Sequence, residues 1–186
     1  MITTLCQKCW QRFTHRPAVA RKFCSLECAG KVSRNIDAAL LDERQKAYLA
    51  GFFDGEGCIH GYFTHPRNGR RMGSTKVTVV CGNLEVLMFG QKLFGGSINK
   101  RVFKEKPKWN DALTWHLGTK ETSVFLRAVL PYLIVKRQEA EVALELWELA
   151  NHPNRGSRKL PEDVINKRSE LVAKLCSLKS RNKVAA

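Results

Sequence analysis

The most constraining feature of the sequence is a predicted helix with small residues along one face and two carboxylates at its end. Ala47, Gly51 and Gly55 are four residues apart, so in a helix they share one face and leave it nearly bare of side chains. Glycine inside a helix costs about 1 kcal/mol relative to alanine. Two glycines within one turn therefore favour a face that another helix approaches closely.

The other face of this helix carries Leu49, Phe52 and Phe53, which we expect to anchor it in the core. Asp54 and Glu56 stand at its C-terminal end, where the negative end of the helix dipole disfavours carboxylates by roughly 0.3–1 kcal/mol. A divalent cation would reverse this preference, with a carboxylate and a free backbone carbonyl as ligands. The alternative is two solvated acids and glycines that simply cap the helix.

The charge balance favours a polyanionic partner. The 186 residues include 32 Lys and Arg against 17 Asp and Glu, a formal net charge of +15. Binding to phosphates releases condensed counterions, so this excess favours nucleic acid over the alternatives of a merely basic protein or a membrane-surface protein. No apolar run reaches the roughly 20 residues that span a bilayer. We therefore expect no membrane partner, no signal peptide and an intracellular protein, in a cytoplasm or an organelle.

Hydrophobic periodicity predicts an α+β domain with an antiparallel sheet, in the order α-β-β-α-β-β-α plus further helices. The predicted elements are a helix from about 38 to 55, strands over 58–65 and 75–80, a helix over 84–94, strands over 97–104 and 113–118, and helices over 120–130 and from Pro131 to about 150. A linker over 151–160 and a basic amphipathic helix over 161–180 follow.

Residues 49–57, LAGFFDGEG, resemble the LAGLIDADG motif of a family of homing endonucleases, with Glu56 at the second acidic position. The predicted order of elements agrees with that family's core, so the resemblance covers roughly residues 38–151. It implies the LAGLIDADG endonuclease fold, whose sheet forms a DNA-binding saddle. It also implies site-specific cutting of double-stranded DNA at a long, near-palindromic target, leaving short 3′ overhangs. A splicing maturase for intron RNA and a non-cleaving DNA-binding regulator are the alternatives on the same core.

The resemblance assigns roles to the residues of the motif. Glu56, with the backbone carbonyl of Gly55, would hold Mg²⁺ for hydrolysis of the phosphodiester. Asp54 is expected to support the end of the helix. Because the motif occurs once, the resemblance implies a homodimer in which the faces of Ala47, Gly51 and Gly55 meet across a two-fold axis.

Two further positions follow from the resemblance. Lys136, with Arg137 as the alternative, matches a basic residue near the cleavage site and would stabilise developing negative charge. The family often has a polar residue at the end of the second strand. Cys81 or Asn83 stands there in this sequence, which leaves open the residue that organises the catalytic water.

Alternation along the predicted strands selects the side chains that face DNA. The outward positions carry hydrogen-bonding groups suited to base edges: His60, Tyr62, Thr64, Lys76, Thr78, Ser97, Asn99, Arg101, Thr114 and His116. The turn between the first two strands carries three arginines expected to grip phosphates: Arg67, Arg70 and Arg71.

Cys6, Cys9, Cys24 and Cys28 form a CxxC…CxxxC set. Thiolates at this spacing close a tetrahedral Zn²⁺ site, which would fold a small module over residues 1–31. The FCSxxC half resembles zinc knuckles attached to mobile-element nucleases, so the module either extends the DNA footprint or aids folding. A zinc-knuckle nucleic-acid binder without chemistry is a further alternative, but it leaves the glycine-lined helix unexplained. Three isolated cysteines are expected to be buried and apolar: Cys58, Cys81 and Cys176.

Overall fold

A four-stranded antiparallel sheet, ordered β3-β4-β6-β5, forms the centre of the described chain. The computed structural model describes residues 1–6, 9–16, 21–25, 28, 41–64, 72–101, 112–150 and 161–181. The strands of this sheet are β3 (Gly57–Thr64), β4 (Met72–Cys81), β5 (Ser97–Arg101) and β6 (Ala112–Leu117). The helices are α1 (Glu43–Glu56), α2 (Leu84–Phe94), α3 (Thr119–Val129), α4 (Arg137–Ala150) and α5 (Glu162–Arg181), with a short 3-10 helix, η2 (Leu130–Tyr132), before α4.

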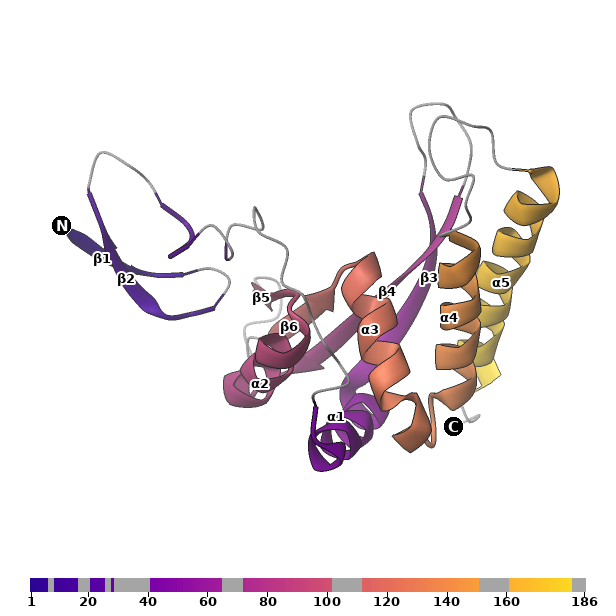
Figure 1. The fold of residues 1–186 in the computed structure, drawn as a ribbon, viewed down its shortest axis with the longest axis horizontal. Coiled ribbons are helices and arrows are strands. Elements are labelled where there is room, and N and C mark those ends of the chain that lie inside the picture. Colours follow the sequence, from indigo (N-terminus) through magenta and orange to yellow (C-terminus); the bar gives the residue numbers. More distant parts are fainter. Residues whose placement is uncertain are drawn as a thin grey trace.

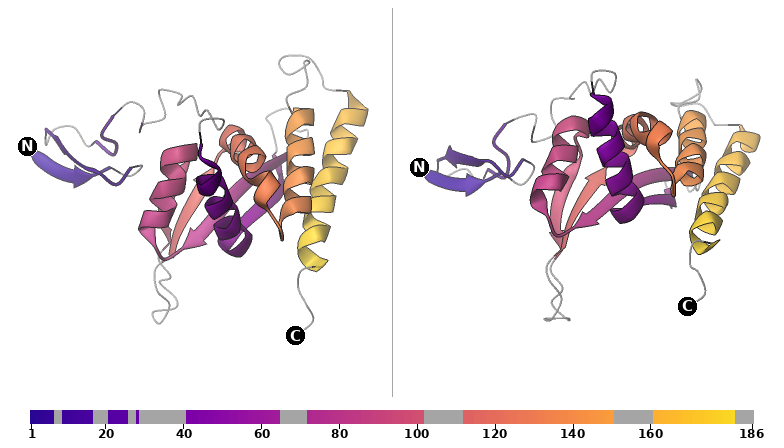
Figure 2. Two further views of the ribbon diagram at one scale, coloured as in Figure 1. Left: turned by 60° about the horizontal axis from the view of Figure 1, so that its bottom comes forward. Right: turned by 90° about the horizontal axis from the view of Figure 1, so that it is seen from below.

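Helices α1 to α4 cover one face of the sheet, and none of the described helices covers the other face (Figures 1 and 2). Alternate residues of each strand therefore meet different surroundings. Ile59 pairs with Val77, and Ile98 pairs with Trp115; all four side chains are buried against the helices. The predicted α+β class, the antiparallel sheet and the order of elements are confirmed.

Four aromatic rings fix α1, α2 and α3 on the sheet. Phe125 of α3 makes edge-to-face contacts with Phe53 of α1, Phe94 of α2 and Trp115 of β6, with ring centroids 5.1, 5.1 and 5.6 Å away. Such pairs contribute about 0.5–1.5 kcal/mol each beyond the area that they bury. The Trp115 indole Nε1 also donates a hydrogen bond to the Gly95 carbonyl at 2.9 Å. This cluster holds α1, and with it the sequence motif, at a fixed place over the sheet.

Two helix starts differ from the prediction by five residues or more. The first helix begins at Glu43, not near residue 38, because the Asp42 side chain accepts a hydrogen bond from the Arg44 amide and caps it. Pro131 lies in η2, and α4 begins only at Arg137. The intervening amides of residues 134–136 donate to Asp54, so they do not extend the helix. The predicted linker over 151–160 lies outside the described residues.

The N-terminal module contains a hairpin that periodicity did not predict, formed by β1 (Ile2–Leu5) and β2 (Arg12–His15). It lies at the α2 end of the molecule (Figure 1). A cleft of about 520 Å³ lies between its cysteines and α2, with Met88 and Phe89 on the α2 side. Trp10 packs against the edge of the core, so the module contacts the domain through a small apolar surface.

Helix α5 packs against α4 and along the β3–β4 hairpin, beside the edge strand β3. The approach is close: a Cβ added at Gly73 would lie 2.9 Å from the backbone oxygen of Arg168, and one at Gly61 would lie 3.2 Å from Leu175. The Arg168 guanidinium donates through Nε to the Gly73 carbonyl at 3.2 Å. The glycines of this hairpin therefore make room for α5. No described helix, α5 included, is long and apolar enough to cross a membrane.

We predict that Gly73→Ala lowers the free energy of unfolding by about 1–3 kcal/mol, because the new methyl group overlaps backbone that cannot rotate away. Urea denaturation measures the change. Gly82→Ala is the matched control, since a Cβ at Gly82 meets nothing within 4 Å. Equal stability of the two variants would contradict the close packing of α5.

Candidate active site

The motif ends in an exposed carboxylate at the junction of α1 and β3. Glu56 is the last residue of α1, and Gly57 caps the helix by donating its amide to the Phe53 carbonyl. Leu49 and Phe53 are buried, whereas Gly55 and Glu56 are exposed. The side chain of Glu56 and the backbone around it are thus open to a ligand that approaches this end of the sheet.

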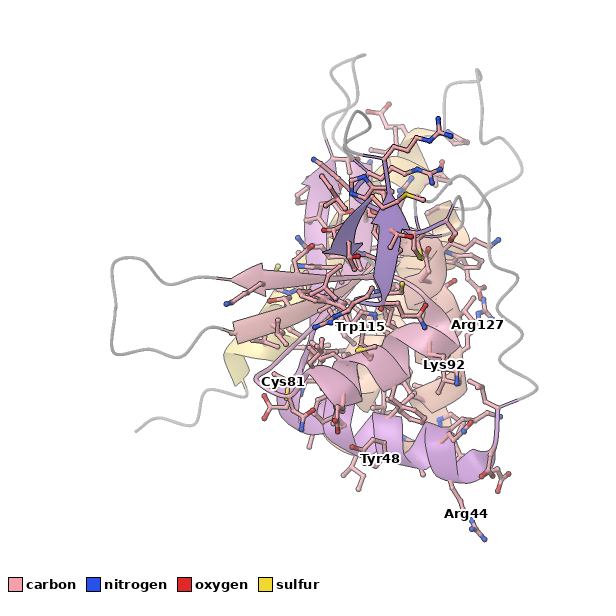
Figure 3. All side chains as sticks on the ribbon, turned by 90° about the vertical axis from the view of Figure 1, so that its left-hand side faces the viewer. Arg44, Tyr48, Cys81, Lys92, Trp115 and Arg127 are labelled. Atoms are coloured by element: carbon pink, nitrogen blue, oxygen red, sulfur yellow. The ribbon has the colours of Figure 1, made fainter. Side chains whose placement is uncertain are left out.

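The glycine face of α1 is exposed along its length. Ala47, Gly51 and Gly55 all lie on the surface, and a Cβ at either glycine would meet nothing within 4 Å. Neither glycine has a left-handed φ. The fold of this chain alone therefore gives no reason for glycine at these positions. Tyr48, whose side chain is 53% exposed, stands beside this face and contacts Phe89 of α2 edge to face (Figure 3).

Asp54 ties the end of α1 to the segment before α4. Its carboxylate accepts three backbone amides, from Ile134 at 2.8 Å, Val135 at 3.2 Å and Lys136 at 3.0 Å. The Lys136 ammonium also donates to the backbone carbonyl of Asp54. Hydrogen bonds to an ionised acceptor are about twice as strong as neutral ones. Asp54 thus fixes Lys136 next to the peptide units that lead to Glu56.

Arg137, the alternative to Lys136, is turned away from this junction. Its guanidinium donates to the backbone carbonyls of Leu133 at 3.2 Å and Pro131 at 3.0 Å. The side chain therefore closes the turn before α4. Of the two basic residues, Lys136 is the one that the structure holds at the end of α1.

The outward face of the sheet carries polar side chains ordered by their neighbours. The His60 imidazole lies 2.8 Å from the Thr78 hydroxyl, and the Lys76 ammonium lies 5.6 Å from the centre of the Tyr62 ring. Burial lowers the pKa of His60, and the nearby positive charges of Lys179 and Lys76, together with the neighbouring His116, lower it further. Burial and Lys76 likewise lower the pKa of His116. Both imidazoles are therefore neutral at neutral pH in the free protein.

Of the remaining residues predicted to face DNA, the structure describes some and not others. Ser97 lies opposite His116, and Asn99 lies opposite Thr114, so they continue the same outward face across β5 and β6. Thr64 and Asn99 are exposed. The side chain of Arg101 and the turn arginines Arg67, Arg70 and Arg71 lie outside what the structure describes.

Neither candidate at the end of β4, Cys81 or Asn83, offers a free side-chain amide to organise a water molecule. The Asn83 side chain accepts hydrogen bonds from the Glu85 amide at 2.9 Å and the Val86 amide at 3.3 Å, which caps α2. Cys81 is half-buried at the end of the strand (Figure 3), and its sulfur accepts the Asn83 amide at 3.3 Å. The Asn83 side chain is therefore occupied in capping α2. Of the two candidates, only Cys81 has a side chain that does not cap a helix.

The isolated cysteines are less buried than expected, and one lies beside a residue that the sequence did not single out. Cys176 is exposed on α5, so its expected burial was wrong, and Cys58 is half-buried. The Lys179 ammonium of α5 lies 3.4 Å from the Cys58 sulfur. Cys58 and Lys179 are 121 residues apart, and sequence spacing carries no signal for this contact.

The four N-terminal cysteines converge on one point. All four sulfurs lie within 4.8 Å of one another, and the Cys24 sulfur is 3.5 Å from those of Cys9 and Cys28. Four thiolates around Zn²⁺ lie about 3.8 Å apart, so this spacing fits the ion. The Cys24 amide donates to the Cys6 sulfur at 3.4 Å. Burial raises the pKa of the Cys9 thiol to about 12, which a bound cation would reverse.

We predict that Asp54→Ala lowers the free energy of unfolding by about 1–3 kcal/mol, because three amides lose their acceptor. It should also increase hydrogen exchange at residues 134–136. Mass spectrometry of exchanged peptides measures the second effect, and Glu148→Ala is a control on α4 whose exposed carboxylate pairs only with Arg127 in the described structure. Unchanged exchange over 134–136 would contradict the role of Asp54.

Comparison with known proteins places the fold. No family model matches the sequence, and no curated protein does. The solved structures that it resembles include the homing endonuclease I-CvuI in complex with a DNA target (TM-score 0.60, 22% identity, 73% of this chain and 82% of that chain). They also include the archaeal intron-encoded homing endonuclease I-Vdi141I with DNA (TM-score 0.60, 16% identity, 73% and 84%).

A third similar structure is the LAGLIDADG homing endonuclease I-SmaMI bound to cleaved DNA (TM-score 0.51, 20% identity). The match covers 73% of this chain but only 42% of I-SmaMI. The chain therefore has the fold of the LAGLIDADG homing endonucleases.

Proposed function

We propose that this chain is the subunit of a homodimeric, metal-dependent endonuclease that cuts double-stranded DNA at a specific site. The observation that carries the proposal is the exposed carboxylate of Glu56, which follows the glycine face of α1 and stands two residues after the Asp54 carbonyl that Lys136 contacts. The open polar face of the sheet begins directly after it, at β3. The solved structures of the same fold, I-CvuI and I-Vdi141I, are complexes with DNA, which agrees with this reading.

The junction has the ligands that a hard divalent cation requires. The Glu56 carboxylate and the Gly55 carbonyl are oxygen donors at the C-terminal end of a helix, where the dipole favours a cation. Mg²⁺ held there would neutralise charge on the phosphate and promote attack by water. Lys136, held by Asp54, adds a fixed positive charge that stabilises the negative charge developing on the phosphate.

The outward face of the sheet is the proposed recognition surface. The side chains of His60 and Thr78 are half-buried and buried, respectively, and hydrogen-bonded to each other before DNA binds, so little side-chain entropy is lost on recognition. His116 is a further half-buried polar residue on this face. Hydroxyls and imidazoles at these positions suit base edges in the major groove. The net charge of +15 supplies the attraction to phosphates that does not depend on sequence.

A second copy of the chain is the proposed occupant of the glycine face. The exposed face of α1 has room for another helix, and Ile134 and Val135, which Asp54 holds beside the end of α1, are 86% and 60% exposed. The chain carries one motif and matches less than half of I-SmaMI. A two-fold axis along α1 would bring two Glu56 carboxylates to one target, which suits a near-palindromic site.

The N-terminal module is proposed to fold around structural Zn²⁺ held by Cys6, Cys9, Cys24 and Cys28. The amide-to-sulfur contact and the turn closed by the Trp10 amide and the Cys6 carbonyl at 2.9 Å support the four sulfurs from the backbone. A hairpin of two four-residue strands has too small a core to be stable alone. The metal would therefore supply most of the module's stability.

We predict that wild-type protein with Mg²⁺ cuts one near-palindromic site in a randomised DNA library, and that Glu56→Gln reduces this rate at least about 100-fold, since a metal ligand is lost. The variant should retain binding to the same site in Ca²⁺. Glu145→Gln, a change at an exposed carboxylate on α4, is the control and should cut at the wild-type rate. Specific binding without cutting by the wild type would instead favour the maturase or the regulator.

We predict one zinc ion per chain by elemental analysis of protein purified without added metal. Cys24→Ser should lose the ion and the amide protection of the β1–β2 hairpin, because the tetrahedral site loses one ligand. Cys176→Ser should keep both, since that thiol is exposed and far along the chain on α5. Zinc retained at full occupancy in Cys24→Ser would remove the proposed site.

A further inference from the structure

The last turn of α5 reaches the sheet next to the proposed catalytic carboxylate. The Lys179 ammonium donates to the Cys58 sulfur at 3.4 Å, and Cys58 follows Glu56 by two residues, about 6–7 Å along the strand. Cys58 and His60 alternate with the buried Ile59, so Lys179 meets the outward face of β3 at its edge. A thiol is a weak hydrogen-bond acceptor for an ammonium, so a charged oxygen would replace it readily.

Positive charge gathers around this point on the sheet. The Cys58 sulfur lies 4.0 Å from Nδ1 of His60, and after burial the charges of Lys179 and Lys76 are the next causes that lower the pKa of His60. Asp54 is taken up by three amides, Glu139 is buried, and Mg²⁺ bound as proposed would offset the charge of the exposed Glu56. With the metal in place, the outward side of Cys58 suits an anion at the surface.

We propose that Lys179 binds a backbone phosphate of the target DNA close to the cut. The inference rests on the proposed endonuclease function, because that function brings DNA to this end of the sheet. It makes α5, which lies outside the resemblance over residues 38–151, part of the binding site. Lys179 contributes affinity and fixes the position of the protein on the DNA. It does not discriminate between bases, since phosphate contacts carry no sequence information.

The test measures affinity for the wild type's own cleavage site, in Ca²⁺, over a range of salt concentrations. Each lost phosphate contact lowers the slope of log K against log salt by about 0.9, so Lys179→Gln should lower it by about 1.8 in a dimer. Glutamine removes the charge but keeps a hydrogen-bond donor for Cys58. Lys179→Arg should restore the slope, because it restores the charge. Lys174→Gln, an exposed lysine on the same helix, should leave most of the slope unchanged.

The outcomes distinguish the two proposals. If the wild type neither cuts nor binds a specific site, the endonuclease function fails first. If the wild type cuts, and folded Lys179→Gln keeps the wild-type slope and affinity, the inference about Lys179 is overturned. If Lys179→Gln does not fold, Lys179→Met, which also removes the charge, takes its place: a slope below that of the wild type supports the inference, and the wild-type slope overturns it.

Discussion

The carboxylate of Asp54 is the interaction on which the arrangement of the candidate site depends. It accepts amides from three consecutive residues about eighty positions later in the chain and so joins the end of α1 to the start of α4. Without this acceptor, three backbone donors and the Lys136 side chain would have no fixed place. The aromatic contacts of Phe53 and Phe125 hold the same helix from its other side. The end of α1 that carries Glu56 is therefore held by two separate sets of contacts.

Much of the fold was predictable because its signals are local. Alternation identified the buried Ile59, Val77 and Trp115, and the motif located the end of α1 to within a residue. The sequence also suggested that Asp54 serves the helix junction, and its contacts agree with that hypothesis. It did not show which backbone groups Asp54 binds, because their partners are distant in the chain. The delayed start of α4 has the same cause, since Asp54 competes for the amides that would have extended the helix.

Composition indicates that the chain attracts an anion, but only the structure indicates where. A net charge of +15 is a property of the whole chain, whereas binding requires charges that converge. Lys76 and Lys179 come from β4 and α5, and both charges act on His60, whose neighbour Cys58 is the residue that Lys179 contacts. Because α5 arrives at this point through close packing against Gly61 and Gly73, the helix that completes the hairpin's packing also brings a cation to the sheet face. The packing of α5 on the hairpin therefore both stabilises the fold and places the charge of Lys179.

The glycines of α1 connect assembly with chemistry. Each costs about 1 kcal/mol in a helix, and neither is required by a turn, a left-handed φ or a neighbour in its own chain. Because no contact within the subunit offsets this cost, we infer that a contact outside the subunit does. In the proposed dimer, close packing at Gly51 and Gly55 offsets that cost, and the same packing brings two Glu56 carboxylates together. A single subunit, with one carboxylate and an open helix face, would carry half of the chemistry needed to cut both strands. In the proposed dimer, the glycines that weaken the isolated helix would therefore also make cleavage depend on the association of two subunits.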